Sequence, residues 1–194
     1  MTLLWKLLMA RKKQTSFSNN QSTIEQVEQY YNDSEESLNS YYSISPLNVL
    51  VSAKFIGYSI DEINRELKER KETLNRMCSL ELLAAIEAKL KIDYIVRGQD
   101  KLKDDFSKKM RQVYNSKANR ASLVEDILFT WKQERPQHKT RLDNLGKALD
   151  YRNWLAHGRY WLPKKHPHIN RYDYFSIYAL ATDILSNLDL IESA

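Results

Sequence analysis

The stretch SLELLAAIEAKLKIDYIVRG, residues 79–98, decides the fold that we expect for this chain. Its apolar residues recur every three or four positions, which is the period of an amphipathic α-helix. Ser79 is a favourable N-cap, and the stripe expected to face a core consists of Leu82, Leu83, Ile86 and Leu90. We therefore expect a helix that begins at Ser79 and continues to Gly98.

The same period recurs along most of the chain, and no segment alternates between apolar and polar residues as a strand does. Ser59 and Glu62 have the spacing of a capping box and predict a helix to about Met77. Further helices are expected at residues 46–56, 100–114, 122–133, 139–158 and 171–191. Core candidates on the last are Phe175, Tyr178, Leu180, Ile184 and Leu188. The sequence thus predicts an all-α bundle.

The predicted organisation has three parts: an N-terminal arm and polar linker at 1–45, a helical extension at 46–78, and the main helical domain at 79–194. Residues 14–45 are rich in Ser, Asn, Gln and Glu, and we expect a linker there with one short helix. Residues 46–76 have the weak pattern of a helix-turn-helix, which leaves DNA binding open as an alternative.

The N-terminus and the single cysteine bear on location. The apolar run in residues 1–10 is interrupted by Lys6 and is too short to cross a bilayer, so we expect no membrane partner. Cys78 is the one cysteine, which excludes an internal disulfide and fits a reducing cytoplasm.

The positive charge of the chain is unevenly spread. The formal net charge is +5, yet residues 97–120 alone hold eight Lys or Arg against three Asp. Residues 157–172 hold four Lys or Arg and no acidic residue. Two basic zones favour a polyanionic ligand such as RNA. The alternative is that they are ordinary solvated faces of helices.

The second basic zone adjoins the motif RNWLAHG, residues 152–158, at an expected helix end. Arg152 can neutralise a phosphate and His157 can move a proton near neutral pH. Metal-free cleavage of RNA needs a base, an acid and a cation. One chain offers a single histidine here, so two copies facing each other across a dimer axis would complete the site. Alternatively, His157 only interacts with the helix dipole and Arg152 pairs with Asp150.

The run YRNWLAHG, residues 151–158, resembles the Arg-x4–6-His motif of the HEPN superfamily (higher eukaryotes and prokaryotes nucleotide-binding), in its sub-form Arg-Asn-x-x-Ala-His. Residues 87–114, 123–131 and 145–164 are similar in spacing and order to bacterial members. The resemblance covers residues 79–190. It implies an antiparallel helical bundle that dimerises with the two motifs facing each other.

The resemblance also implies an activity. Members of this family are commonly metal-independent endoribonucleases that serve as toxins or anti-phage defence effectors, with no cofactor. Carried over, Arg152 and His157 become the catalytic pair, and Asn153 becomes a polar residue that orients the site. Other members bind a nucleotide or RNA without cutting it and act in assembly or regulation, which is the alternative function.

An antitoxin or a defence-system component is a further expected partner. Toxins of this family that pair with a nucleotidyltransferase antitoxin often carry a tyrosine two positions after the histidine. Here Arg159 holds that position and Tyr160 follows it. This departure puts the nucleotidyltransferase partnership in doubt and leaves the nuclease activity untouched.

Two further groups of residues are candidates for the site. Arg159, Tyr160, Lys164 and Lys165 could hold phosphates and stack bases, or could merely form a surface loop. Glu87, Asp93 and Arg97 could orient Arg152 through a carboxylate, or could be exposed helix charges.

Overall fold

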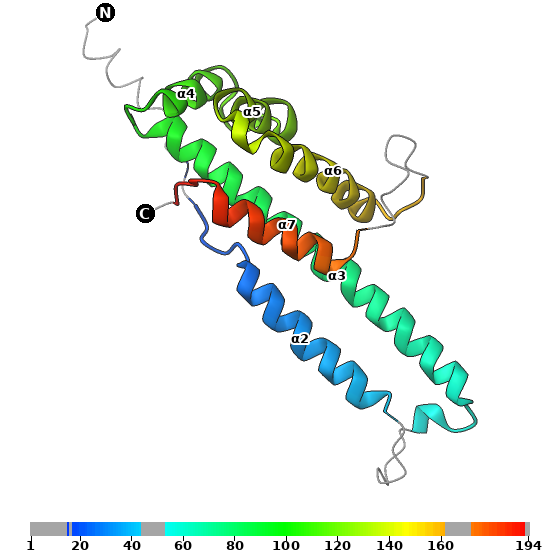
Figure 1. Ribbon diagram of the computed structural model, residues 1–194. Helices are drawn as coiled ribbons and strands as arrows, with labels where there is room; N and C mark the ends of the chain where they lie inside the picture. Colours follow the sequence, from blue (N-terminus) through cyan, green and yellow to red (C-terminus); the bar gives the residue numbers. More distant parts are fainter. Residues whose placement is uncertain (1–14, 16, 44–52, 162–171, 193–194) are drawn as a thin grey trace, which may run out of the picture. The chain divides into compact units, whose positions relative to one another are not determined.

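A computed structural model describes residue 15 and residues 17–43, 53–161 and 172–192, and every regular element among them is helical (Figure 1). The predicted all-α class is therefore confirmed. The helices are α2 (Ile24–Tyr41), α3 (Ile60–Gln99), α4 (Asp105–Lys117), α5 (Phe129–Glu134), α6 (Lys139–Ala156) and α7 (Tyr174–Asn187). A π-helical segment, Leu123–Leu128, precedes α5. A bilayer-spanning helix is not found in the described part of the chain.

The chain divides into two compact units. The first, here the α2–α7 unit, consists of residues 22–86 and 143–187, and it contains the Arg152–His157 motif. The second, here the α4–α5 unit, consists of residues 1–21, 87–142 and 188–194. The long helices α3 and α6 each contribute residues to both.

In the α2–α7 unit, α2 runs antiparallel to the first part of α3. The hydroxyl of Tyr31 donates to the side-chain oxygen of Asn75 at 2.9 Å, and that of Tyr42 donates to Glu66 at 2.9 Å. Residues later in the sequence of α2 thus contact residues earlier in α3, as antiparallel helices do. The Tyr31 ring also stacks on that of Tyr174, with centroids 3.7 Å apart, and so joins α2 to α7.

Residues 14–45 contain the one helix expected there, but α2 has 18 residues and is not a short helix within a linker. Thr23 and Gln26 form a capping box at its start, and Ile24, Val27 and Tyr31 are its buried residues. These three lie on one helical stripe. α2 is therefore a polar helix with a narrow apolar face, and its composition is similar to that of a linker.

The expected helix break between Met77 and Ser79 is also wrong. The capping box of Ser59 and Glu62 begins α3 as predicted, with the Ser59 N–H donating to the Glu62 carboxylate at 2.8 Å. The helix then continues to Gln99, and Ser79 lies buried in its interior. The reason is a buried stripe with a spacing of four, Leu74, Cys78 and Leu82, which no Gly or Pro interrupts.

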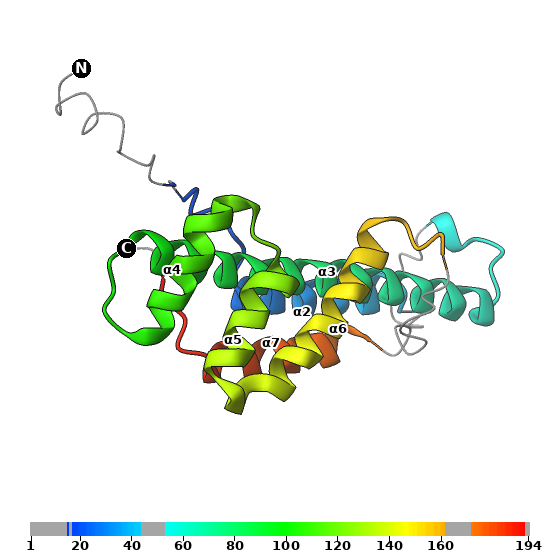
Figure 2. The ribbon, with the colours of Figure 1, turned by 90° about the horizontal axis from the view of Figure 1, so that it is seen from above.

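The core of the α4–α5 unit lies between α3, α4 and α5. Figure 2 shows the ribbons of these three helices from above. The rings of Phe106 and Trp131 pack with centroids 4.4 Å apart. Leu90 is buried as predicted, and the apolar residues Met110, Ile127 and Leu128 are buried with it. α3 and α4 approach so closely that a Cβ on Gly98 would lie 2.4 Å from the Tyr114 ring.

The core stripe of α7 differs from the expected one. Its buried residues are Tyr174, Ile177, Ala181 and Ile184. Phe175 is 60 % exposed, so its predicted place in the core is wrong, whereas Ile184 and Leu188 are buried as expected. Because each helical residue advances by about 100°, a stripe through Tyr174 and Ile177 turns Phe175 outward.

Candidate functional site

The motif lies at the C-terminal end of α6, where the chain leaves the helix through a Schellman motif. The N–H of Gly158 donates to the carbonyl of Leu155 at 3.2 Å, and that of Arg159 donates to Trp154 at 3.0 Å. Gly158 has a φ of +78°, a conformation that residues with a Cβ rarely adopt. The predicted helix end at Gly158 is confirmed, and His157 is the last residue before the turn.

The functional candidates lie in the last turns of this helix or directly after it. The N–H of His157 donates to the carbonyl of Asn153 at 3.1 Å, so these two residues lie one helical turn apart. Arg152 donates from Nη1 to Oδ1 of Asn153 at 3.0 Å. Asn153 and His157 are exposed and Arg152 is half-buried. The side-chain amide of Asn153 thus contacts Arg152, and its backbone carbonyl accepts the helical hydrogen bond of His157.

The turn after His157 is held by aromatic residues. The indole N–H of Trp154 donates to the carbonyl of Trp161 at 2.8 Å, which folds residues 157–161 back onto the helix. The Trp161 ring lies 6.0 Å from the His157 ring and 4.8 Å from that of Tyr160. Tyr160 is 84 % exposed. The ring of His157 therefore neighbours that of Trp161, and the ring of Trp161 neighbours the exposed ring of Tyr160.

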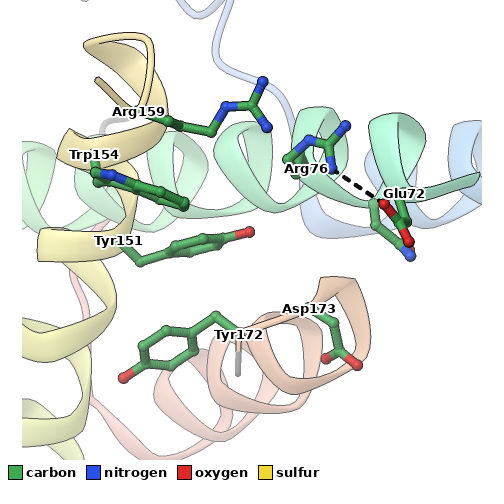
Figure 3. Close-up of a pocket in the computed structure, with 8 residues that line it drawn as sticks. Glu72, Arg76, Tyr151, Trp154, Arg159, Tyr172 and Asp173 are labelled. Atoms are coloured by element: carbon green, nitrogen blue, oxygen red, sulfur yellow. Dashed lines mark ion pairs between the residues drawn. The ribbon is translucent and has the colours of Figure 1, made fainter. Parts of the chain in front are cut away.

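A cavity of about 310 Å³ lies elsewhere in the α2–α7 unit, against α3, the end of α6 and the start of α7 (Figure 3). The residues that line it are Glu72, Asn75, Arg76, Tyr151, Trp154, Arg159, Tyr172 and Asp173. Tyr151 and Trp154 lie one helical turn apart. Because each residue of a helix advances by about 100°, their side chains leave α6 in a different direction from those of Asn153 and His157. We call this space the Arg76–Arg159 cavity.

The aromatic side of the Arg76–Arg159 cavity is a series of three rings. The Tyr151 ring lies 5.4 Å from Tyr172, nearly parallel to it, and 6.2 Å from Trp154. Burial raises the pKa of Tyr151, and the positive charge of Arg76 opposes that shift. Local spacing in the sequence does not predict this cavity, because its lining comes from three segments far apart in the chain.

Asp93 and Arg97 form an ion pair inside the α4–α5 unit. Both are buried, so their reading as exposed helix charges is wrong. Arg97 donates from Nε to Asp93 at 2.8 Å and from Nη2 to the carbonyl of Asp189 at 2.7 Å, and Asp93 also accepts the N–H of Ile191 at 2.8 Å. Burial raises the pKa of the Asp93 carboxyl. The pair thus holds the segment that follows α7.

The other candidates are less closely defined. Glu87 forms an ion pair with Lys91 at 2.7 Å, and a role for Glu87, Asp93 or Arg97 in orienting Arg152 stays a prediction. Arg159 lines the Arg76–Arg159 cavity, whereas Lys164 and Lys165 lie outside the described residues. In the described ranges, no three His, Cys, Asp or Glu side chains are grouped as metal ligands.

Comparisons with protein-family models, with curated proteins and with solved structures found no match to this chain.

Proposed function

We propose that this protein is a metal-independent endoribonuclease of the HEPN type, with Arg152, Asn153 and His157 as its active-site residues. The observation that carries the proposal is the exposed end of α6, where His157 lies one turn from Asn153 and Asn153 contacts Arg152. An exposed histidine and a half-buried guanidinium near a helix end that is held by a tight cap can act together on a phosphodiester.

The chemistry follows from these groups. His157 accepts the proton of the ribose 2′-hydroxyl, whose oxygen forms a bond to phosphorus. Arg152 stabilises the extra negative charge of the five-coordinate phosphorus. The bond from phosphorus to the 5′-oxygen then breaks, and an acid gives that oxygen a proton. The products are a 2′,3′-cyclic phosphate and a 5′-hydroxyl end.

A second copy of the chain would supply the acid. Each helix end offers one histidine, and an exposed motif can meet its symmetric copy across a two-fold axis. Two copies would then provide a base, an acid and two guanidiniums. The exposed ring of Tyr160 would stack a base near the cut. In a cell, the activity would suit a toxin or an anti-phage defence effector.

The decisive experiment is RNA cleavage in the presence of EDTA. We expect the wild type to cut total RNA and short oligonucleotides and to leave cyclic phosphate ends. His157→Ala should lose about 10²–10⁴-fold in rate, the usual contribution of a positioned acid or base. His138→Ala is the matched control, since His138 lies outside the motif and contacts Arg141.

Three results would contradict this function. Cleavage that stops with EDTA, or that survives in His157→Ala, would exclude the proposed mechanism. A monomeric mass in light scattering at micromolar concentration would exclude the shared site. Binding of RNA without any products would instead favour a non-catalytic module that uses the same arginine and histidine to hold a phosphate.

A further inference from the structure

The Arg76–Arg159 cavity is a second place where this chain could bind a ligand. It lies within the α2–α7 unit and its lining includes neither Arg152 nor His157. Its volume of about 310 Å³ is at the lower end of the range for small-molecule sites. One small organic ligand would fill it.

The cationic part of the cavity is formed by two arginines. Figure 3 shows the guanidinium of Arg159 extending from the end of α6 toward that of Arg76 on α3. The ion pair of Arg76 with Glu72 is long, at 3.8 Å. The guanidinium of Arg159 has neither a hydrogen bond nor an ion pair with any described residue. Two guanidiniums directed at one space favour an anion between them, and arginine binds phosphate through paired N–H groups.

The position of Arg159 is fixed by the backbone. Its N–H closes the Schellman motif on Trp154, and its φ is +59°. Non-glycine residues adopt such a φ rarely and at some cost in free energy, so the surrounding structure imposes it. The cap of α6 thereby directs this guanidinium to the same side of the helix as Tyr151 and Trp154.

The rest of the lining selects among anions. Three aromatic rings form one side, and flat rings of a ligand pack well against such a surface. The carboxylates of Glu72 and Asp173 would repel a bare polyanion but would accept hydrogen bonds from hydroxyl groups. Asp173 already accepts the N–H of Ser176 as it caps α7. A ligand with a phosphate, hydroxyl groups and a flat ring matches all three parts of the lining.

We infer that the Arg76–Arg159 cavity binds a nucleoside phosphate, either free or as the end of an RNA chain, with its phosphate between Arg76 and Arg159 and its base against the aromatic side. This site is separate from the active site proposed above. It does not depend on the ribonuclease activity, because no residue is shared between them.

The test uses the full-length protein and AMP as the probe, with binding followed by calorimetry and by Trp fluorescence. Adenosine and inorganic phosphate are the partial ligands, and a 5′-phosphorylated RNA hexamer tests the chain-end source. We expect AMP or the hexamer to bind at least tenfold more tightly than either partial ligand. Arg76→Gln and Arg159→Gln should each weaken that binding at least tenfold.

Two variants make the test specific. Arg65→Gln removes an exposed arginine of α3 outside the cavity and should bind as the wild type does. His157→Ala should abolish cleavage and leave AMP binding unchanged, so the two proposals can fail separately. The inference is overturned if neither AMP nor the hexamer binds at millimolar concentration, if phosphate or adenosine binds as tightly, or if both Arg→Gln variants bind normally.

Discussion

Arg97 and Arg152 both lie in the last turns of a helix, and their surroundings differ. Arg97 is buried and donates to Asp93, to Ser107 and to the carbonyl of Asp189, all within the α4–α5 unit. Arg152 contacts Asn153 on a side of α6 where His157 is exposed. A buried arginine whose donors meet acceptors of its own unit stabilises the fold. An arginine beside an exposed histidine can act on a ligand, so substitution should affect the two differently.

The largest effect is expected at Arg97. Replacement by Gln leaves the buried Asp93 carboxylate without its cation, which typically costs about 3–5 kcal/mol. Urea unfolding at pH 7.5 should show this loss. Arg65→Gln, the matched change of an exposed arginine on the same helix, should stay within about 0.5 kcal/mol of the wild type.

The loss in Arg97→Gln should also depend on pH. Burial already raises the pKa of Asp93, and removal of Arg97 raises it further. The folded state then keeps a proton that the unfolded state releases above its ordinary pKa of about 4. Folding is therefore destabilised increasingly as pH rises, and the loss should be smaller at pH 5 than at pH 7.5. An equal or larger loss at pH 5 would contradict the ionic role of this pair.

Arg152→Gln should reverse the pattern. Removing one charge-stabilising donor from an active site usually lowers the rate about 10²–10³-fold, or about 2.7–4 kcal/mol. The free energy of unfolding should change by less than about 0.5 kcal/mol. Single-turnover cleavage and urea unfolding on the same preparation measure both. A destabilised protein, or one that cuts RNA as the wild type does, would remove the distinction between the two arginines.

The sequence predicted those features whose causes are local. The cap at Ser59 and the end of α6 at Gly158 depend on residues within one turn, and both are where they were expected. The length of α2 was not predicted although Thr23 and Gln26 have capping-box spacing, because the polar composition of residues 14–45 favours a linker with only a short helix. The helix break at Ser79 was wrongly predicted because a serine can cap a helix. The apolar stripe of Leu74, Cys78 and Leu82 favours a continuous helix instead.

The rest of the site could not be predicted from spacing. Asp93 and Arg97 are buried because the segment after α7 covers them, nearly 100 residues later in the chain. Arg76 and Arg159 line one cavity only because α3 and the end of α6 belong to one unit. A single sequence contains the charges of these residues but not their neighbours, so the role of each arginine depends on contacts over long separations.

The approach of α3 to α4 gives a smaller effect. A Cβ at Gly98 would lie 2.4 Å from Cγ of Tyr114, so Gly98→Ala must displace that ring or the helix. Overpacking of this kind costs about 1–3 kcal/mol. Thermal unfolding of Gly98→Ala measures it, and Gly98→Ala should cost less in a Tyr114→Ala background, where the ring is absent, than in the wild type. An equal cost in both backgrounds would mean that it arises elsewhere.

The smallest effect is expected at Gly158 and has an internal control at Gly146. Gly158→Ala forces a Cβ into a φ of +78°, at a cost of about 1–2 kcal/mol. Gly146 lies inside α6 with open space around its Cα, so Gly146→Ala should stabilise by about 0.5–1 kcal/mol. Asparagine tolerates this φ, so Gly158→Asn should lose less stability than Gly158→Ala.

Because the same turn sets the position of Arg159, Gly158→Ala should also weaken AMP binding. Gly146→Ala should not, and equal binding by both variants would separate the helix cap from the cavity.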